Sequence, residues 1–548
     1  MTPKNHSNMN FMNTSNLVST LKLFLVVATI LISASICSAS GNLYVAQTAT
    51  GAASGASCSN AFPVSWFNSS SSWGSGSTQI GPGTTVHLCG TITTTLSAQA
   101  SGASGNPITI TFETGAKISV GACGSSGCIN VNSLNWLVID GSPSGTPCGY
   151  VARANVACNG IIEATNTGTG LGSSESIGIY ARGASNLEIR NLMIRNMYVH
   201  TSNTDTGTGS NYYGVWYGAP SSDSVNIHNM TFHDMKAAVV GETPNSNNTV
   251  AYSEMYNVNW GSFMSGGHSI DGISHFSFHD NNVHDLANWD TTTDSFHHDG
   301  VMLASDDTQG NTVTQSDIYN NYFHGSAGSP TCSGGNPCVT AWIFLEGVHN
   351  IRVYNNVLVA NSGEEAANGW IFFWSPTSAL NNGDVVANNV VLGSNLSDGA
   401  CVRVEGDSSM RLENNILSGC AYLTWMDSNT TWTALDDNIY QSSSLQWRNN
   451  NSVYNSLASW QSSSGGDANA KATTSSLNLG STFTPSSGSP AIGAGANLSS
   501  LGVVTLDTDI AGNARPSSGN WDAGVYQTGA TSSAQRPLPP TGLVVTIK

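Results

Sequence analysis

A short unit, in which two strand-like runs flank asparagine, recurs along this chain and limits what it can fold into. The clearest copy is residues 350–362, N-I-R-V-Y-N-N-V-L-V-A-N-S, and related copies lie at 225–232, 276–283, 318–323, 385–392 and 410–417. The copies are separated by roughly 23 to 39 residues, which fits one structural repeat with or without a loop insertion. No Asn-Gly or Asp-Gly turn joins the two runs of a copy, so the strands cannot form tight hairpins and have to pair with the next copy.

Asparagine suits this arrangement because it tolerates the left-handed backbone conformation of a sharp bend. Stacked asparagine amides can also hydrogen-bond along a column from one copy to the next. Charged residues make up only 9% of the chain while glycine numbers 58, a composition that favours strands and turns over helices. The sequence therefore predicts an all-β solenoid of parallel strands, in which each coil buries its inward side chains against its neighbours.

The first 40 residues have the features of an export signal. Lys4 and Lys22 precede an apolar run at 23–36, and small residues at 37–40 provide a cleavage site. The run is too short to span a membrane comfortably. We expect a secreted or cell-surface protein with no membrane contact after cleavage; an uncleaved N-terminal anchor is the alternative.

Cysteine number supports the same compartment. The chain has 11 cysteines, and removal of Cys37 with the signal leaves an even number. An even cysteine set in an exported protein indicates disulfides, and the absence of Cys-x-x-Cys argues against zinc. Sequence alone cannot fix the pairing, but close spacing suggests Cys58 with Cys89, Cys123 with Cys128, Cys148 with Cys158, Cys332 with Cys338, and Cys401 with Cys420.

Several segments resemble a known family. The strand at 43–46, the stretch 102–112 (G-A-S-G-N-P-I-T-I-T-F), the coil at 136–141 and the asparagine repeat make residues 42 to about 527 similar to the pectate-lyase-like superfamily. The resemblance implies a right-handed parallel β-helix with capping segments, acting on a polysaccharide. Of the hydrolase-branch motifs only Asp299-Gly300 and Asp306-Asp307 are echoed, so the resemblance does not select a reaction.

The chain divides by composition and repeat. We assign residues 1–40 to a signal peptide, 41–176 to an N-terminal cap and first coils, and 177–441 to central coils. Residues 442–527 form C-terminal coils and a cap, which hides the last strands, and 528–548 form a loose tail.

Aromatic residues gather on one predicted outward face. Neighbouring residues on a strand point to opposite faces, so inward Ile343 and Leu345 place Phe344 outside. The same reasoning predicts a substrate-binding set that stacks on sugar rings, with burial under a loop as the alternative: Trp216, Trp342, Phe344, Trp370, Phe372, Trp374 and Arg403.

A polar cluster lies just upstream of this face. Asp299 and His298 are the first candidates for acid and base, with Asp271 and with Glu346 as a partner carboxylate. Carboxylates could instead hold Ca²⁺, the one cofactor considered, for which the candidates are Asp294, Asp306 and Asp307. In a lyase, Lys236 or Arg403 would be the base. The alternative is that such corner residues only bind turn amides.

Net charge limits the partners. Lys and Arg number 16 against 34 Asp and Glu, a net charge of −18, which argues against nucleic acid or anionic membrane. The same charge favours a neutral glycan unless Ca²⁺ bridges a polyuronate. We expect a monomeric, secreted protein that cleaves polysaccharide as a lyase or hydrolase; a non-catalytic glycan-binding rod is the alternative.

Overall fold

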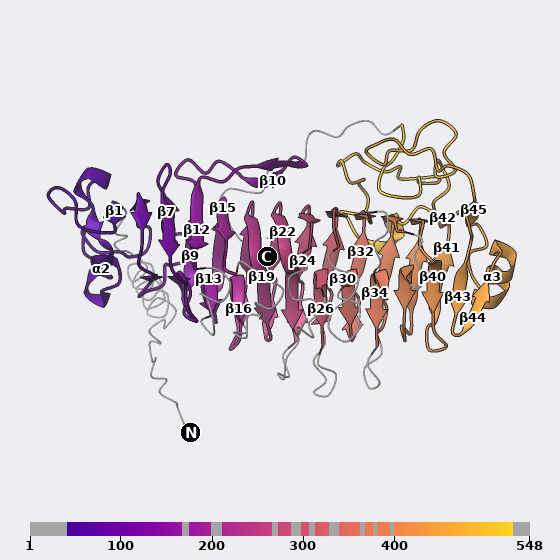
Figure 1. The fold of residues 1–548 in the computed structure, drawn as a ribbon, viewed down its shortest axis with the longest axis horizontal. Coiled ribbons are helices and arrows are strands. Elements are labelled where there is room, and N and C mark those ends of the chain that lie inside the picture. Colours follow the sequence, from indigo (N-terminus) through magenta and orange to yellow (C-terminus); the bar gives the residue numbers. More distant parts are fainter. Residues whose placement is uncertain are drawn as a thin grey trace, which may run out of the picture.

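The computed structural model of the chain is a parallel β-helix, which confirms the predicted fold class (Figure 1). It describes residues 41–166, 175–198, 211–265, 272–286, 298–305, 313–327, 339–361, 366, 368–375, 381–394 and 399–529. Within them, strands pair in parallel along a 14-stranded, a 24-stranded and a 5-stranded sheet. The signal peptide and residues 530–548 lie outside the described residues.

Each central coil visits the sheets in the same order. A strand of the 14-stranded sheet comes first, and its central members are β14 (Ser185–Arg190), β18 (Val225–His228), β21 (Thr249–Ala251), β24 (Ser277–His279), β28 (Asp317–Tyr319), β32 (Arg352–Tyr354), β35 (Val385–Ala387), β38 (Met410–Glu413) and β41 (Trp432–Asp436). A short strand of the 24-stranded sheet follows: β15 (Leu192–Arg195), β25 (Asn282–His284), β29 (Tyr322–His324), β33 (Val357–Val359), β36 (Val390–Leu392), β39 (Ile416–Ser418) or β42 (Ile439–Gln441).

A second row of the 24-stranded sheet, here called the long-strand row, completes most coils. It contains β13 (Ser176–Arg182), β16 (Tyr212–Gly218), β26 (His298–Ala304), β30 (Val339–Glu346), β34 (Gly369–Trp374), β37 (Ala400–Val404), β40 (Tyr422–Met426) and β43 (Trp447–Asn449). Two longer strands run through both rows, namely β19 (Thr231–Glu242) and β22 (Glu254–Ser265). The 5-stranded sheet then leads to the next coil: β17 (Ser222–Asp223), β20 (Asn245–Ser246), β23 (Ile273–Ser274), β27 (Val313–Thr314) and β31 (Val348–His349).

Inward side chains of successive coils form one continuous core. Val301, Ile343, Ile371 and Val402 are partners in register and are fully buried. Each therefore packs on the coil before and the coil after it, as a solenoid requires. The alternation of inward and outward residues along a strand predicted that these four side chains point inward.

The two asparagines of each repeat have different roles, one in the backbone turn and one in side-chain hydrogen bonding. The first takes the left-handed conformation, as at Asn320 (φ 57°) and Asn355 (φ 54°). The second is buried, and its Nδ2 donates to Oδ1 of the next coil, from Asn321 to Asn356 at 2.9 Å and from Asn356 to Asn389 at 3.0 Å. The ladder continues through Asn415 and Asn438 to the carboxylate of Asp467, which confirms the predicted amide column.

The ends of the β-helix are covered by helices, which are few among the described residues. Helix α2 (Val64–Phe67) lies beside the first coil, and α3 (Leu457–Ser464) packs on β43 with Trp460 buried in the core. Residues 477–525, expected to cap the open end, instead pack along the side of the coils against Val357, Val390 and Ile416 (Figure 1). The segment lies there because its apolar side chains pack against outward apolar side chains of the short strands β33, β36 and β39.

Four of the five suggested disulfides are present: Cys58–Cys89, Cys123–Cys128, Cys148–Cys158 and Cys401–Cys420. Cys332 and Cys338 lie outside the described residues. In the described part of the chain, no helix is long and apolar enough to cross a membrane.

Candidate functional site

The outward surface of the long-strand row carries a continuous column of side chains, one per coil. Strand pairing in register places ten residues on it, here called the outer column: Tyr180, Trp216, Val240, Phe263, Met302, Phe344, Phe372, Arg403, Trp425 and Arg448. A polymer lying along the helix axis would meet each of these residues in turn, at the coil spacing of about 4.8 Å.

A second outward column, the flank column, lies two residues further along the same strands. Register places Glu242 opposite Ser265, and Glu346 opposite both Ala304 and Trp374. Glu242 is ion-paired with Arg182 at 2.9 Å, and the Arg182 guanidinium lies 5.0 Å from the Trp216 ring. The flank column thus brings carboxylates next to the aromatic residues of the outer column.

The middle of the outer column is packed rather than solvated. Phe344 and Phe372 stack with ring centroids 5.3 Å apart, and only 3% and 4% of their surfaces are exposed. They form an outer cluster with Trp260 and Met302, so the expectation of a solvent-facing aromatic surface is wrong for these two rings. Trp374, by contrast, is 39% exposed and stacks on Phe344 at 6.3 Å.

Trp342 and Trp370 do not face outward, contrary to the prediction. Both belong to the central core, together with their neighbours Ile343 and Ile371. Two consecutive inward residues mean that the strand bends between them, which strict alternation does not allow for. In earlier coils the same position is glycine, and a Cβ at Gly300 would lie 2.7 Å from the Phe323 ring. Later coils have room there for a tryptophan.

Two guanidinium groups enclose one indole at the C-terminal end of the outer column. The Cζ atoms of Arg403 and Arg448 lie 3.7 and 3.8 Å from the ring centroid of Trp425. Arg403 is ion-paired with Glu405 and donates from Nη1 to Asn368 Oδ1 at 2.9 Å. Arg448 donates from Nε to a backbone carbonyl and has no carboxylate partner among the described residues. Its remaining N–H groups can bind an acceptor from a ligand.

Asp299 lies on the outer side of β26 but has no exposed surface. Its Oδ1 accepts from the Ala341 N–H at 3.1 Å, and its Oδ2 accepts from Trp260 Nε1 at 3.2 Å. The Lys236 ammonium lies 5.7 Å from the Trp260 ring. Asp299 is thus held by the packed part of the face, beside the buried His298.

The register separates Asp299 from its suggested partner carboxylate. Asp299 lies opposite Ala341, and Glu346 is at the other end of β30, about 16 Å away along an extended strand. Two carboxyl groups acting on one glycosidic bond are about 5 to 9.5 Å apart. The strands therefore do not assemble Asp299 and Glu346 into one acid–base pair, and Glu346 lies next to Trp374 instead.

Burial affects the ionisation of one further group on this face. Loss of solvent raises the pKa of Tyr213, and the charges of Glu242 and Glu175 raise it further. Tyr213 lies edge-on to Trp216 at 5.6 Å. It stays a neutral phenol at physiological pH and can donate a hydrogen bond, but it cannot act as a base.

The other candidates lie outside the described residues, namely Asp271, Asp294, Asp306 and Asp307. The described part of the chain holds no group of three or more His, Cys, Asp or Glu side chains able to bind a metal ion. The Ca²⁺ site stays a prediction.

Sequence reasoning missed Trp425 and Arg448. Both continue the outer column one and two coils beyond Arg403. The coil of Trp425 carries the Asn414-Asn415 pair, so counting on from that repeat is the signal that could have found it. The coil of Arg448 has Asp437-Asn438 in place of an asparagine pair, so its repeat is less clear.

Comparison with known proteins concerns the fold. No family model matches the chain, and no curated protein matches it. Among solved structures, pectate lyase Pel9A is similar at 15% identity over 89% of this chain and 96% of that chain, with a TM-score of 0.43. The GH136 lacto-N-biosidase from Eubacterium ramulus is 11% identical over 76% and 69%, with a TM-score of 0.45. A complex of XylC with xylose is 9% identical over 89% and 98%, with a TM-score of 0.40.

Proposed function

We propose that this protein is an exported carbohydrate-active protein that binds and cleaves a polysaccharide along the outward surface of its long-strand row. The observation that carries the proposal is the outer column itself, which continues in register into the guanidinium–indole stack and has carboxylates beside it. Aromatic rings contact sugar faces, and guanidinium groups bind hydroxyl or acidic substituents. Four disulfides support export, because they form in oxidising compartments.

We propose sugar contact only at the accessible side chains of the outer column and the flank column. Trp374 offers an exposed ring, Trp216 is half-buried, and Arg448 offers free N–H groups. Phe344 and Phe372 support Trp374 from below through their stack. The substrate chain would then run parallel to the helix axis from Trp216 towards Arg448.

Glu346 is the proposed reacting carboxyl group. It lies beside the exposed Trp374 ring, whereas Asp299 has no exposed surface. As a general acid it would protonate the glycosidic oxygen while water attacks the sugar carbon and gives its proton to solvent. As a base it would take a ring proton in an elimination, in which the bond to the glycosidic oxygen breaks and that oxygen is protonated by solvent. Arg403 is an unsuitable base, because its guanidinium remains protonated and is paired with Glu405.

A non-catalytic glycan-binding rod is the second candidate. The burial of Asp299 and His298 favours it, because the first-choice acid and base are inaccessible as they stand. In that case the outer column would bind glycan without cleaving it.

The test is a screen of the purified mature protein against neutral and uronate polysaccharides, with and without Ca²⁺. Ultraviolet absorbance reports a lyase, and reducing ends without absorbance report a hydrolase. We expect Glu346→Gln to abolish cleavage, and the distant Glu113→Gln to serve as a matched control that leaves it intact. Full cleavage by Glu346→Gln would remove Glu346 from the mechanism, and loss of cleavage in Asp299→Asn alone would assign the role to Asp299. Binding without cleavage of any polysaccharide would establish the rod.

A further inference from the structure

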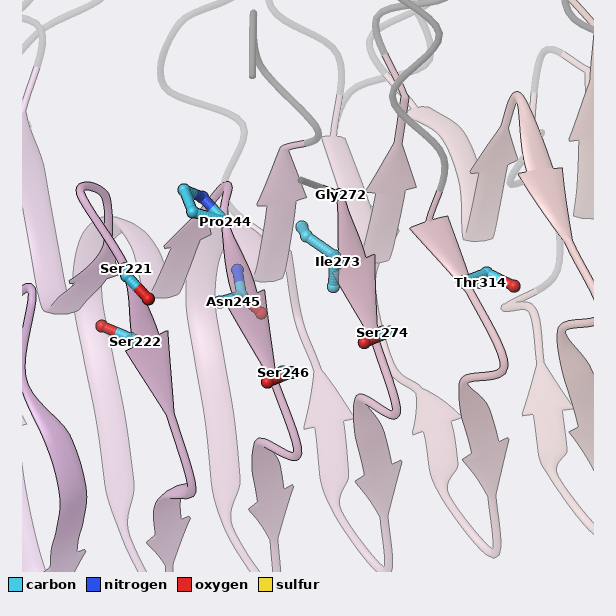
Figure 2. A pocket seen from close by; sticks show the side chains of 9 residues that line it. All are labelled: Ser221, Ser222, Pro244, Asn245, Ser246, Gly272, Ile273, Ser274 and Thr314. Atoms are coloured by element: carbon cyan, nitrogen blue, oxygen red, sulfur yellow. The ribbon is translucent and has the colours of Figure 1, made fainter. Parts of the chain in front are cut away.

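Two adjoining hollows lie on another side of the β-helix, along the 5-stranded sheet. The first, of about 290 Å³, is lined by hydroxyl and amide side chains from four neighbouring strands, among them Asn245, Ser246, Ser274 and Thr314 (Figure 2). The second, of about 460 Å³, is lined by His275, Gln315, Asn350, Arg352, Gly383 and Val385. Ser274 and Thr314 of the first hollow directly precede His275 and Gln315 of the second, so the two hollows adjoin along successive coils and are here together called the sheet-edge groove.

The centre of the groove holds polar side chains that other described residues do not occupy. Within the described part of the chain, the side chains of Ser274, Thr314, Gln315 and Asn350 make no hydrogen bond. The N-terminal end differs, because Ser246 Oγ donates to Asp223 Oδ1 at 2.6 Å. The central coils therefore present donors and acceptors for a ligand that spans them.

Several residues along the sheet-edge groove have a positive φ. One turn position recurs in register through the coils, and its residue has a positive φ each time. Asn350 (φ 56°) and Gly383 (φ 74°) adopt this conformation readily, but His275 (φ 54°) and especially Gln315 (φ 51°) are costlier choices. His275 and Gln315 line the larger hollow, whereas Trp136 (φ 59°) and Ser224 (φ 56°) hold the same turn position in coils outside both hollows. The positive φ therefore belongs to the repeat, and what distinguishes the groove is its exposed polar side chains.

The described residues that line the groove are close to neutral in charge. The one cation among them is Arg352, which forms two hydrogen bonds of 2.5 Å from Nε and Nη2 to the carboxylate of Asp317. Burial raises the pKa of Asp317, and the contact with Arg352 opposes that effect. A ligand therefore meets hydroxyl, amide and imidazole groups and one neutralised ion pair. That chemistry matches an uncharged polyhydroxylated chain better than an anionic one.

We propose that the sheet-edge groove is a second carbohydrate-binding surface, which holds an uncharged glycan chain parallel to the helix axis. The groove advances by about 4.8 Å per coil, comparable to the length of one sugar unit. The surface is separate from the long-strand row, and it contributes binding whether or not the outer column cleaves glycan. Gln315 and Asn350 are its central contacts, flanked by Ser274 and Thr314.

The test is affinity electrophoresis of the full chain in native gels that contain barley β-glucan, galactomannan or starch, with pectate as an anionic comparator. We expect at least one neutral polysaccharide to retard the protein. Gln315→Asn and Gln315→Gly should weaken that retardation at least tenfold. Both variants suit a positive φ better than glutamine, so their Tm should be unchanged or higher, which excludes misfolding as the cause.

Two controls test whether the loss of binding is specific to the groove. Asn186→Gly changes the same turn position (φ 51°) four coils earlier, outside both hollows, and should bind like the wild type. Glu113→Gln, at a position outside both the groove and the outer column, should also keep neutral-glycan retardation. The proposal fails if no neutral polysaccharide retards the protein, if Gln315→Gly binds like the wild type, or if Asn186→Gly loses the retardation to the same extent.

Discussion

Arg448 lies with its Cζ atom 3.8 Å from the ring centroid of Trp425, and Arg403 lies on the neighbouring coil at 3.7 Å from the same ring. In a chain with a net charge of −18, these two guanidinium groups are a local concentration of positive charge. Arg403 has its own carboxylate, Glu405, but Arg448 has none in the described part of the chain. The stack therefore holds the Arg448 guanidinium in place while its remaining N–H groups stay able to bind an acceptor from a ligand.

Arg448→Gln tests whether these N–H groups bind the substrate. We expect kcat/KM for polysaccharide cleavage to fall at least tenfold, about 1.4 kcal/mol, because a charged donor to the substrate is lost. The free energy of unfolding should fall by about 1 to 2 kcal/mol, since Arg448 is half-buried, stacks on the Trp425 ring and makes one hydrogen bond with the described residues. Arg153→Gln, at an exposed arginine elsewhere, is the control. Equal losses in both variants would mean that the effect is only one of net charge.

Trp374 and Trp342 provide a second test, because the strands place one tryptophan outside and one inside. Trp374→Ala should weaken glycan binding with little change in stability, since the ring is 39% exposed. Trp342→Ala should lower the free energy of unfolding by about 3 to 5 kcal/mol, because it empties a buried site in the core. Urea unfolding and glycan binding measured on both variants check this. Similar destabilisation by the two changes would contradict the bend that turns Trp342 inward.

An asparagine of the buried amide column should contribute more to stability than a turn asparagine outside that column. In Asn356→Ala the Asn321 N–H and side chain both lose their acceptor, at 3.0 and 2.9 Å. Each unpaired buried group costs about 1 to 3 kcal/mol, so we expect a loss of about 2 to 5 kcal/mol in total. Asn186→Gly, at a half-buried turn position with φ 51°, keeps the left-handed turn and should cost less than about 1 kcal/mol. Comparable losses by urea unfolding would show that the amide column is not what stabilises the coils.

A buried pair of carboxyl groups should make stability depend on pH. Burial raises the pKa of Asp384 well above its usual range, and the charge of Asp407 raises it further. Asp384 Oδ2 and Asp407 Oδ2 are buried and find no separate donor among the described residues, so one proton shared between the two carboxyl groups would satisfy both. Because the folded-state pKa is raised, this stabilisation is complete below the unfolded pKa of about 3.9 and is lost as pH rises through the folded value.

Asp384→Asn should remove this loss of stability at rising pH. The Asn Oδ1 can still accept from the Ile351 N–H, now 2.6 Å from Asp384 Oδ1, and its amide can donate to Asp407 at any pH. The unfolding free energy of the wild type should therefore fall more steeply than that of the variant between pH 5 and pH 9. Urea unfolding at several pH values measures both slopes. Parallel curves would mean that the pair does not hold a proton in the folded state.

Much of the fold follows from local signals. The repeat located the strands because each copy carries its own turn asparagine, and Asn320 and Asn355 adopt the conformation for which asparagine is suited. Alternation placed Ile343 and Phe344 on opposite sides correctly. Strict alternation of inward and outward residues wrongly predicted that Trp342 faces outward. The sequence of a single coil does not reveal the bend that turns both Trp342 and Ile343 inward. It appears only when Gly300 is aligned with Trp342 across coils.

The site was less predictable, because it depends on register and on what covers a surface. Proximity in sequence suggested Asp299 and Glu346 as partners, but β26 and β30 pair so that the two lie at opposite ends of the row. Burial of Phe344 and Phe372 depends on the cluster around them, which includes Trp260 from another coil. Pairings of that kind are long-range, and no single segment encodes them.

The solenoid and the amide column follow from the sequence, because each depends on residues within one repeat or between adjacent repeats, and close spacing also suggested the four disulfides that the described residues contain. Which aromatic rings reach the surface, where residues 477–525 pack, and that Arg448 joins the outer column depend on the tertiary structure. Those features depend on how coils stack and on which side chains fill the spaces between them. Packing at that level is a property of many residues together, and it appears only in three dimensions.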